Sequence, residues 1–244
     1  MKFAVLGVAK NIANQCQILK ECLNAILDQR PGSRAYIYED GSTDGTKEKL
    51  RAMAIEDKRI TVTCEDVETE TKAQSWDNKP CRMERIASAR NKCMEMWEKD
   101  KEEAVVIWID TDRVERLDGG LIHQLAEQLT QNPIEVAAAF FAMSLNHRGQ
   151  MYDTYAYRSE KNALGPELLG EKWIKECQQP IFDEVNNHPQ PTLQVLSACN
   201  GLAMYRSEAI RGLRFSALPT LSIEKYYRQV YRDSKHPCHF KLLE

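Results

Sequence analysis

Short apolar runs alternate with segments of helical periodicity along the first half of the chain. A short uninterrupted apolar run is typical of a strand buried on both faces, whereas apolar residues spaced three and four apart indicate an amphipathic helix. Strands joined by helical crossovers pair in parallel. The pattern therefore predicts an α/β fold with a Rossmann-like, mostly parallel central sheet flanked by helices. The predicted strands are 3–8, 35–38, 60–64 and 104–109, and the helices between them are 18–27, 46–54 and 82–97.

The pattern is weaker in the second half of the chain. Loops are predicted where periodicity is lost, over 65–80 and 179–191. The length of 244 residues suits one α/β domain with a single large core. The predicted helices are 121–129, 166–177, 207–212 and 223–231, and the predicted strands are 136–143, 193–198 and 202–205.

Charge and hydropathy exclude two classes of partner. With 33 basic and 36 acidic residues the net charge is −3, so we expect no nucleic acid and no anionic membrane surface as partner. The longest apolar runs, 105–109 and 136–143, fall far short of the ~20 residues that a transmembrane helix needs. The apolar stretch at the N-terminus stops at Lys10 without the features of a signal peptide. These observations predict a cytoplasmic protein without a transmembrane segment.

The eight cysteines do not form a recognisable framework. None occurs in a C-x-x-C pair, and several lie within apolar helical patterns. We therefore expect reduced, buried thiols and not a zinc site or a set of disulfides.

Three polar clusters directly follow predicted strands, at 10–11, 39–46 and 110–112. Ligands of open parallel sheets bind outside the carboxyl ends of the strands. The three clusters are therefore the candidate functional site.

Asp110 and Asp112 lie two residues apart after a buried strand. On an extended backbone such residues point to the same face, so both carboxylates could meet at one cation. Hard oxygen ligands suit Mg²⁺ or Mn²⁺, which complete their coordination with substrate phosphates. The alternative is a polar turn in which Asp112 caps the next helix.

Two further residues have a candidate binding role. The glycines and capping residues of 41–46 are typical of a strand-to-helix turn, but they leave Asp40 unexplained. Asp40 is placed to accept a hydrogen bond from a ligand group such as the N–H of a base. Arg90 falls on the apolar stripe of its helix, where a buried guanidinium needs an anion. That anion is either a ligand or a buried aspartate in a structural ion pair.

Several of these segments together resemble a known family. The run 37–46 resembles the [N/E]DGSTDGT signature of nucleotide-sugar glycosyltransferases of the GT-A fold, especially family 2. Residues 85–91 resemble their ARN helix, and 108–112 their D-x-D motif. Two later segments, 152–158 and 199–206, resemble the fungal capsule-associated mannosyltransferases and related viral glycosyltransferases. The likeness extends over about residues 3 to 210.

The resemblance implies a single GT-A domain, 1–244, with a nucleotide-sugar-binding half (1–115) and an acceptor-binding half (116–244). It implies a metal-dependent, inverting transfer to a glycan or glycoconjugate acceptor, with Mn²⁺ or Mg²⁺ held by Asp110 and Asp112. A UDP-sugar is favoured as donor because Asp40 matches the uracil-contacting position of family 2, and a GDP-sugar stays open. The positions assigned to substrate binding are Val8, Ala9, Lys10, Asn11, Asp40, Asp44, Arg90, Asp110, Thr111, Asn200 and Gly201.

The catalytic base is the point at which this sequence departs from the family. Inverting relatives use a carboxylate, often in an acidic pair some two dozen residues beyond the glycine-rich acceptor segment. Here that position holds Ile223-Glu224, with one acidic residue instead of two. Glu224 is the first candidate for the base, followed by Asp153 and Asp183. The alternative for Glu224 is a glutamate that only stabilises the N-terminus of a helix.

Three other interpretations remain open. Residues 110–114 also fit the nucleophile loop of haloacid-dehalogenase-like phosphohydrolases, although no Asp-Asp pair occurs in the chain. A nucleotidylyltransferase would need a long Gly-rich, basic loop after the first strand, and 7–11 is not one. A non-catalytic glycan- or nucleotide-binding module on the same fold is the third alternative.

Overall fold

The structure is a computed structural model, and it describes part of the chain. Residues 2–65, 79–101, 104–114, 118–131 and 201–216 form its continuous segments, and the backbone alone is described for 79–83 and 140–141. The chain divides into two compact units. The first comprises 1–140 and 202–217, and the second 141–201 and 218–244. The isolated described positions are 159, 161, 183, 184, 187, 195, 221, 225 and 229.

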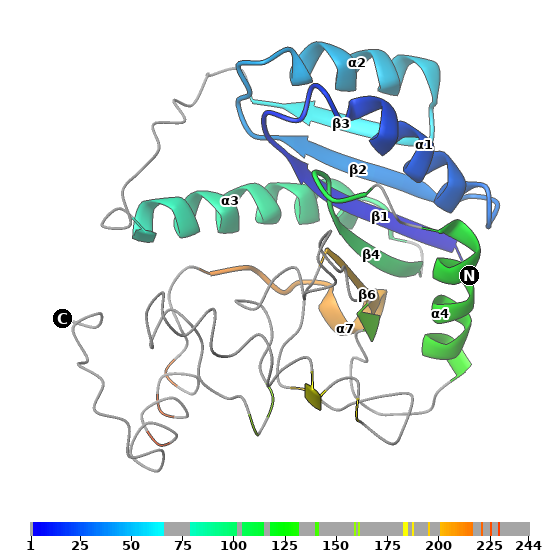
Figure 1. Ribbon diagram of the computed structural model, residues 1–244, viewed down its shortest axis with the longest axis vertical. Helices are drawn as coiled ribbons and strands as arrows, with labels where there is room; N and C mark the ends of the chain where they lie inside the picture. Colours follow the sequence, from blue (N-terminus) through cyan, green and yellow to red (C-terminus); the bar gives the residue numbers. More distant parts are fainter. Residues whose placement is uncertain are drawn as a thin grey trace. The chain divides into compact units, whose positions relative to one another are not determined.

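A six-stranded sheet organises the first unit, in the order β3-β2-β1-β4-β6-β5 (Figure 1). β1 pairs in parallel with both β2 and β4, and β2 pairs in parallel with β3. β6 runs antiparallel to β4. The strands are β1 (Lys2–Ala9), β2 (Arg34–Glu39), β3 (Ile60–Cys64), β4 (Ala104–Asp110), β5 (Phe140–Phe141) and β6 (Leu202–Arg206).

Helices pack on both faces of this sheet. α1 and α3 each pack on β1 and β2 without a comparable contact with each other, so they cover opposite faces. α2 and α4 pack against α1 and belong to its layer. The helices are α1 (Cys16–Leu27), α2 (Thr46–Glu56), α3 (Lys79–Glu98), α4 (Gly119–Gln131) and α7 (Ser207–Ile210).

The apolar runs of the sequence form the centre of the sheet. Residues 3–7 of β1 and 104–109 of β4 are buried, as expected for strands covered on both faces. The predicted α/β class with a mostly parallel sheet is confirmed, and β3 has the predicted bounds. The helix predicted over 82–97 is longer, since α3 begins at Lys79. Of the predicted strand 136–143 the structure describes only 140–141, and the elements predicted over 166–177 and 193–198 lie almost wholly outside the described residues.

The predicted burial of the thiols is confirmed for three of the four whose side chains are described. Cys16, Cys22 and Cys93 are buried and free, and Cys64 is half-buried and free. Burial raises the pKa of Cys22 to about 12, which keeps this thiol protonated and unreactive. The other four cysteines lie outside the residues whose side chains are described.

A glycine permits the close approach of α1 and α4. A Cβ on Gly119 would lie 2.3 Å from the main-chain oxygen of Ala25 and 2.8 Å from its carbonyl carbon. We expect Gly119→Ala to destabilise the protein by about 1–3 kcal/mol, because backbone must move to relieve the overlap. Urea unfolding at unchanged m-value measures this loss. The control is Gly120→Ala, whose Cβ meets only the movable Asp118 side chain, at 3.1 Å; equal losses in both variants would contradict the packing argument.

No helix within the described segments is long and apolar enough to cross a membrane.

Candidate functional site

The register of the sheet brings the three polar clusters to one edge. Val8 of β1 is level with Tyr38 of β2 on one side and with Asp110 of β4 on the other. The residues that follow these three positions therefore leave the sheet together, at its carboxyl edge. The predicted site at this edge thus has a geometric basis, with Lys10, Asp40 and Asp110 at the ends of three adjacent strands.

Side-chain hydrogen bonds join the loop after β1 to the loop after β2. The main-chain N–H of Asn11 donates to Ser42 Oγ at 2.9 Å, and that of Ile12 to Thr46 Oγ1 at 2.8 Å. In return Asn11 Oδ1 accepts from the N–H of Thr43 at 3.0 Å. Asn11 takes a left-handed backbone conformation (φ 53°), which asparagine tolerates better than most residues. The run 41–46 therefore shapes the loop after β1.

Asp44, which the sequence assigns to substrate binding, supports this same junction. Its carboxylate accepts hydrogen bonds from the N–H of Ala13 (3.0 Å), the N–H of Thr46 (3.1 Å) and the hydroxyl of Thr46 (2.6 Å). Burial by itself would raise the pKa of Asp44, but these hydrogen bonds outweigh it and lower the pKa. The contacts show Asp44 holding the start of α2 and the loop after β1.

Asp40 is a buried carboxylate beside two cations. Its side-chain oxygen Oδ2 lies 3.7 Å from Lys10 Nζ and 3.1 Å from Arg85 Nε of α3. Lys10 Nζ also donates to the main-chain oxygen of Asp40 at 2.9 Å. Burial raises the pKa of Asp40 and lowers that of Lys10, and the attraction between the two charges opposes both shifts. Asp40 directly follows the last residue of β2, Glu39.

A second acidic residue, Glu39, lies beneath the loop after β2. Its side chain is fully buried, and one carboxylate oxygen accepts the N–H of Ser42. The other oxygen, Oε2, has no hydrogen-bond partner in the described part of the protein. Glu39 therefore fixes the turn that follows Asp40.

The end of β4 carries Asp110, Thr111 and Asp112. Thr111 Oγ1 donates to the main-chain oxygen of Val8 at 2.8 Å, which joins this turn to β1. Gly7 allows that approach, since a Cβ there would lie 2.7 Å from Thr111 Cγ2.

The prediction that Asp110 and Asp112 share one face of an extended backbone was wrong. β4 ends at Asp110, and Asp112 lies in a turn, exposed to solvent. Among the described residues no group of three or more acidic, histidine or cysteine side chains forms a metal cage.

Arg90 contacts aromatic rings and not an aspartate. Its guanidinium carbon lies 6.0 Å from the ring centre of Trp108 and 5.2 Å from that of Phe215. No ion pair or hydrogen bond of its guanidinium is found among the described residues, so the structural ion pair considered for it is not observed there. Trp108 stands two residues before Asp110 on β4, on the same face of the sheet.

The candidates in the second unit are largely outside the described residues. Three of them, Asp153, Asn200 and Glu224, are outside the described residues. Asp183 is described as an exposed helical residue, so the predicted loop 179–191 contains helical backbone. Gly201 is described with φ 93°, a conformation that glycine adopts without strain.

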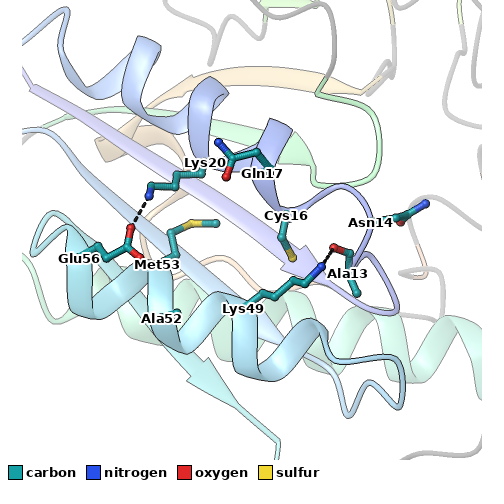
Figure 2. A pocket seen from close by; sticks show the side chains of 9 residues that line it. All are labelled: Ala13, Asn14, Cys16, Gln17, Lys20, Lys49, Ala52, Met53 and Glu56. Atoms are coloured by element: carbon teal, nitrogen blue, oxygen red, sulfur yellow. Dashed lines mark hydrogen bonds and ion pairs between the residues drawn. The ribbon is translucent and has the colours of Figure 1, made fainter.

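A cavity of about 310 Å³ lies between α1 and α2 and reaches Ala13 of the loop after β1 (Figure 2). Lys20 of α1 and Glu56 of α2 form an ion pair across it, and Lys49 donates to the main-chain oxygen of Ala13 at 2.7 Å. None of the predicted site residues lines the cavity.

A profile of one protein family matches nearly the whole chain. The family described as Cryptococcal mannosyltransferase 1 matches residues 8–236. The chain belongs to this family. The predicted resemblance to fungal capsule-associated mannosyltransferases is thereby confirmed, and the family is one of glycosyltransferases. No curated protein sequence matches the chain.

Solved structures support the same fold. The crystal structure of S. aureus TarS 1-349 matches with a TM-score of 0.50 at 14% identity, over 95% of this chain and 55% of that one. The crystal structure of S. aureus TarS matches with a TM-score of 0.50 at 14% identity, over 89% and 31%. The chain thus spans about half the length of the TarS 1-349 structure. The structure of a mannosyltransferase from Pyrobaculum calidifontis in complex with GDP-Man and Mn²⁺ matches with a TM-score of 0.46 at 15% identity, over 86% of this chain and 45% of that one.

Arg85 and Glu39 are the site residues that the sequence alone did not single out. Arg85 stands five residues before Arg90 on α3, and its contact with Asp40 places this part of α3 at the carboxyl edge of the sheet. A basic residue in the first turns of a helix that starts at the ligand edge is the signal that would have identified Arg85. Glu39 looked like an ordinary member of the acidic turn, and only its complete burial distinguishes it.

Proposed function

We propose that the protein transfers a sugar from a nucleoside-diphosphate sugar, most favourably a UDP-sugar, to a glycan or glycoconjugate acceptor. The observation that carries this proposal is the convergence of Lys10, Asp40 and Asp110 at one edge of the sheet, with Arg85 beside Asp40. Such an edge is where α/β proteins bind nucleotides. Membership in a glycosyltransferase family supports the same activity.

The chemistry of Asp40 and its neighbours favours uracil. The pairing edge of uracil offers one N–H donor between two carbonyl acceptors, whereas that of guanine offers one acceptor and two donors. Asp40 supplies an acceptor, and Lys10 and Arg85 supply donors beside it. The amino group of guanine, a hydrogen-bond donor, would face the cationic side chain of Lys10 or Arg85, which cannot accept a hydrogen bond. The protein is therefore expected to prefer UDP over GDP, and thymine nucleotides share the favoured edge.

The aspartates at the end of β4 suit a divalent cation. Two carboxylates are too few for a complete cage, but Mg²⁺ and Mn²⁺ are held by one or two carboxylates together with substrate phosphates. Asp110 and the exposed Asp112 offer such a partial set of hard oxygen ligands, open to solvent. We assign them to Mn²⁺ or Mg²⁺, which when bound supplies positive charge against the departing diphosphate.

The transfer itself requires removal of a proton from the acceptor hydroxyl. In an inverting reaction one carboxylate acts as general base while the sugar–phosphate bond breaks. Glu224 is assigned this role on sequence grounds, with Asp153 and Asp183 as alternatives. Asn200 and Gly201 belong to the expected acceptor segment.

Thermal unfolding with nucleotides tests the proposed donor site. UDP with Mn²⁺ is expected to raise the melting temperature, because a ligand that binds only the folded state stabilises it by mass action. UDP should raise it more than GDP or CDP, and UDP without Mn²⁺ should raise it less. Differential scanning fluorimetry with UDP, dTDP, GDP and CDP, each with and without Mn²⁺, measures these shifts.

The same experiment separates the alternatives. No shift with any nucleotide would contradict the donor site and favour the phosphohydrolase or the glycan-binding module. A larger shift with GDP than with UDP would still support a glycosyltransferase, but it would contradict the selection of uracil by Lys10 and Arg85. Arg85→Met provides the matched variant: it keeps an unbranched apolar stem on α3, removes the cation, and should reduce the UDP shift selectively.

A further inference from the structure

A side-chain amide on α3 holds a segment that lies far away in the sequence. Asn91 Nδ2 donates to the main-chain oxygen of Phe215 at 3.0 Å, and Asn91 Oδ1 accepts from the N–H of Phe215 at 2.7 Å. Residues 213–216 have no regular secondary structure of their own. The two hydrogen bonds thus fix the position of Phe215 relative to α3.

Phe215 completes an aromatic pair that surrounds a cation. Its ring lies 5.4 Å from that of Trp108, at an interplanar angle of 85°, which is the favoured edge-to-face arrangement. The guanidinium of Arg90, the residue next to Asn91, contacts both rings. Asn91 and Arg90 therefore both contact Phe215, Asn91 through its main chain and Arg90 through its ring.

The aromatic contacts leave Arg90 suited to bind an anion. A guanidinium stacks on rings with its faces, while its five N–H donors point outward in its own plane. Within the described residues these donors have no hydrogen-bond or ion-pair partner. Trp108 and Asp110 share one face of β4, and α3 runs from the edge where Arg85 meets Asp40. Arg90 thus lies on the helix that borders the candidate site.

We propose that Asn91 is a positioning residue for Arg90: by fixing Phe215 it holds the guanidinium ready to bind the diphosphate of the donor. This inference rests on the proposed function. Asn91 does not touch the nucleotide in this scheme, and its effect passes through Phe215 to Arg90. Loss of Asn91 should then weaken only the part of binding that depends on phosphate.

The test compares ligands with and without the diphosphate. Dissociation constants of UDP and of uridine are measured by titration calorimetry or NMR, with Mn²⁺ present, for the unaltered protein, Asn91→Ala, Arg90→Ala and the double variant. We expect Asn91→Ala to weaken UDP binding about tenfold, the loss of a charge-assisted hydrogen bond, and to leave uridine unchanged. In the Arg90→Ala background the same substitution should have no further effect. Ser88→Ala, at an exposed position of the same helix, is the control.

A second variant guards against a general loss of folding. Phe215→Leu keeps the main-chain hydrogen bonds to Asn91 and an apolar side chain, but removes the ring. It should weaken UDP binding as Asn91→Ala does, with less loss of thermal stability.

Each other outcome counts against the inference in a distinct way. Equal weakening of UDP and uridine would mean that Asn91 supports the whole site, and an additive double variant would mean that it acts independently of Arg90. Unchanged UDP affinity in Asn91→Ala overturns the inference alone. Failure of the unaltered protein to bind UDP at all would instead reject the proposed donor site, and the inference with it.

Discussion

Asp110→Asn and Asp112→Asn are each expected to abolish sugar transfer while leaving the fold intact. Both substitutions keep the size of the side chain and remove the negative charge that a divalent cation requires. A cation at a developing negative charge is worth several kcal/mol, and each 1.4 kcal/mol is tenfold in rate, so we expect losses of about 10³-fold or more in kcat/KM. Turnover of the donor with and without acceptor, measured as release of UDP, provides the rates.

The structure supplies a control for this prediction. Asp28 caps the end of α1, the end remote from the carboxyl edge of the sheet, and its side chain is exposed. Asp28→Asn makes the same chemical change there and should leave turnover unaltered. Asp112 is also exposed, so its substitution should shift the melting temperature little. Normal turnover in Asp112→Asn, with an unchanged requirement for Mn²⁺, would remove Asp112 from the metal site.

Hydrophobic patterning predicted the sheet well because burial on both faces leaves a strong signal. The run 104–109 is apolar throughout and forms the central strand β4, and the register of β1 with its two neighbours follows from parallel pairing. The polar clusters after β1, β2 and β4 therefore meet at one edge, as the sequence indicates. A local pattern is sufficient to predict this site, because parallel pairing aligns the carboxyl ends of the strands at one edge.

Patterning failed where the backbone leaves regular structure. Alternation along a strand was applied to Asp110 and Asp112, but the strand ends between them and the second aspartate lies in a turn. Alternation carries no information beyond the last paired residue. Any approach of the two carboxylates to one cation therefore depends on the turn, which Thr111 holds against β1.

Contacts between distant segments were not visible in the sequence at all. Arg90 was expected to need an anion, but the rings that surround it come from β4 and from residue 215. Nothing in the neighbourhood of Asn91 in the sequence indicates that its amide binds Phe215. The same holds for Arg85, whose partner Asp40 follows a different strand. Only the packing of α3 across the sheet brings these groups together.

Glu224→Gln is expected to lower kcat by about 10²- to 10⁴-fold, the usual contribution of a general base, with little change in the affinity for UDP. The amide has the shape of the carboxylate but cannot take the proton of the acceptor hydroxyl. Initial rates at saturating donor and acceptor give kcat, and titration of UDP gives the affinity. The anomeric configuration of the product, determined by NMR, tests the inverting course.

The alternative for Glu224 makes an opposite prediction. A glutamate that only interacts with the N-terminus of a helix contributes about 0.3–1 kcal/mol to stability and nothing to the chemical step. Glu224→Gln would then lower the melting temperature slightly and leave kcat within a few-fold of the unaltered value. That result would reassign the general base to Asp153 or Asp183. Asp153→Asn and Asp183→Asn would then decide between the two, because only loss of the base lowers kcat without changing the affinity for UDP. A loss of UDP affinity equal to the loss of kcat would instead place Glu224 in donor binding.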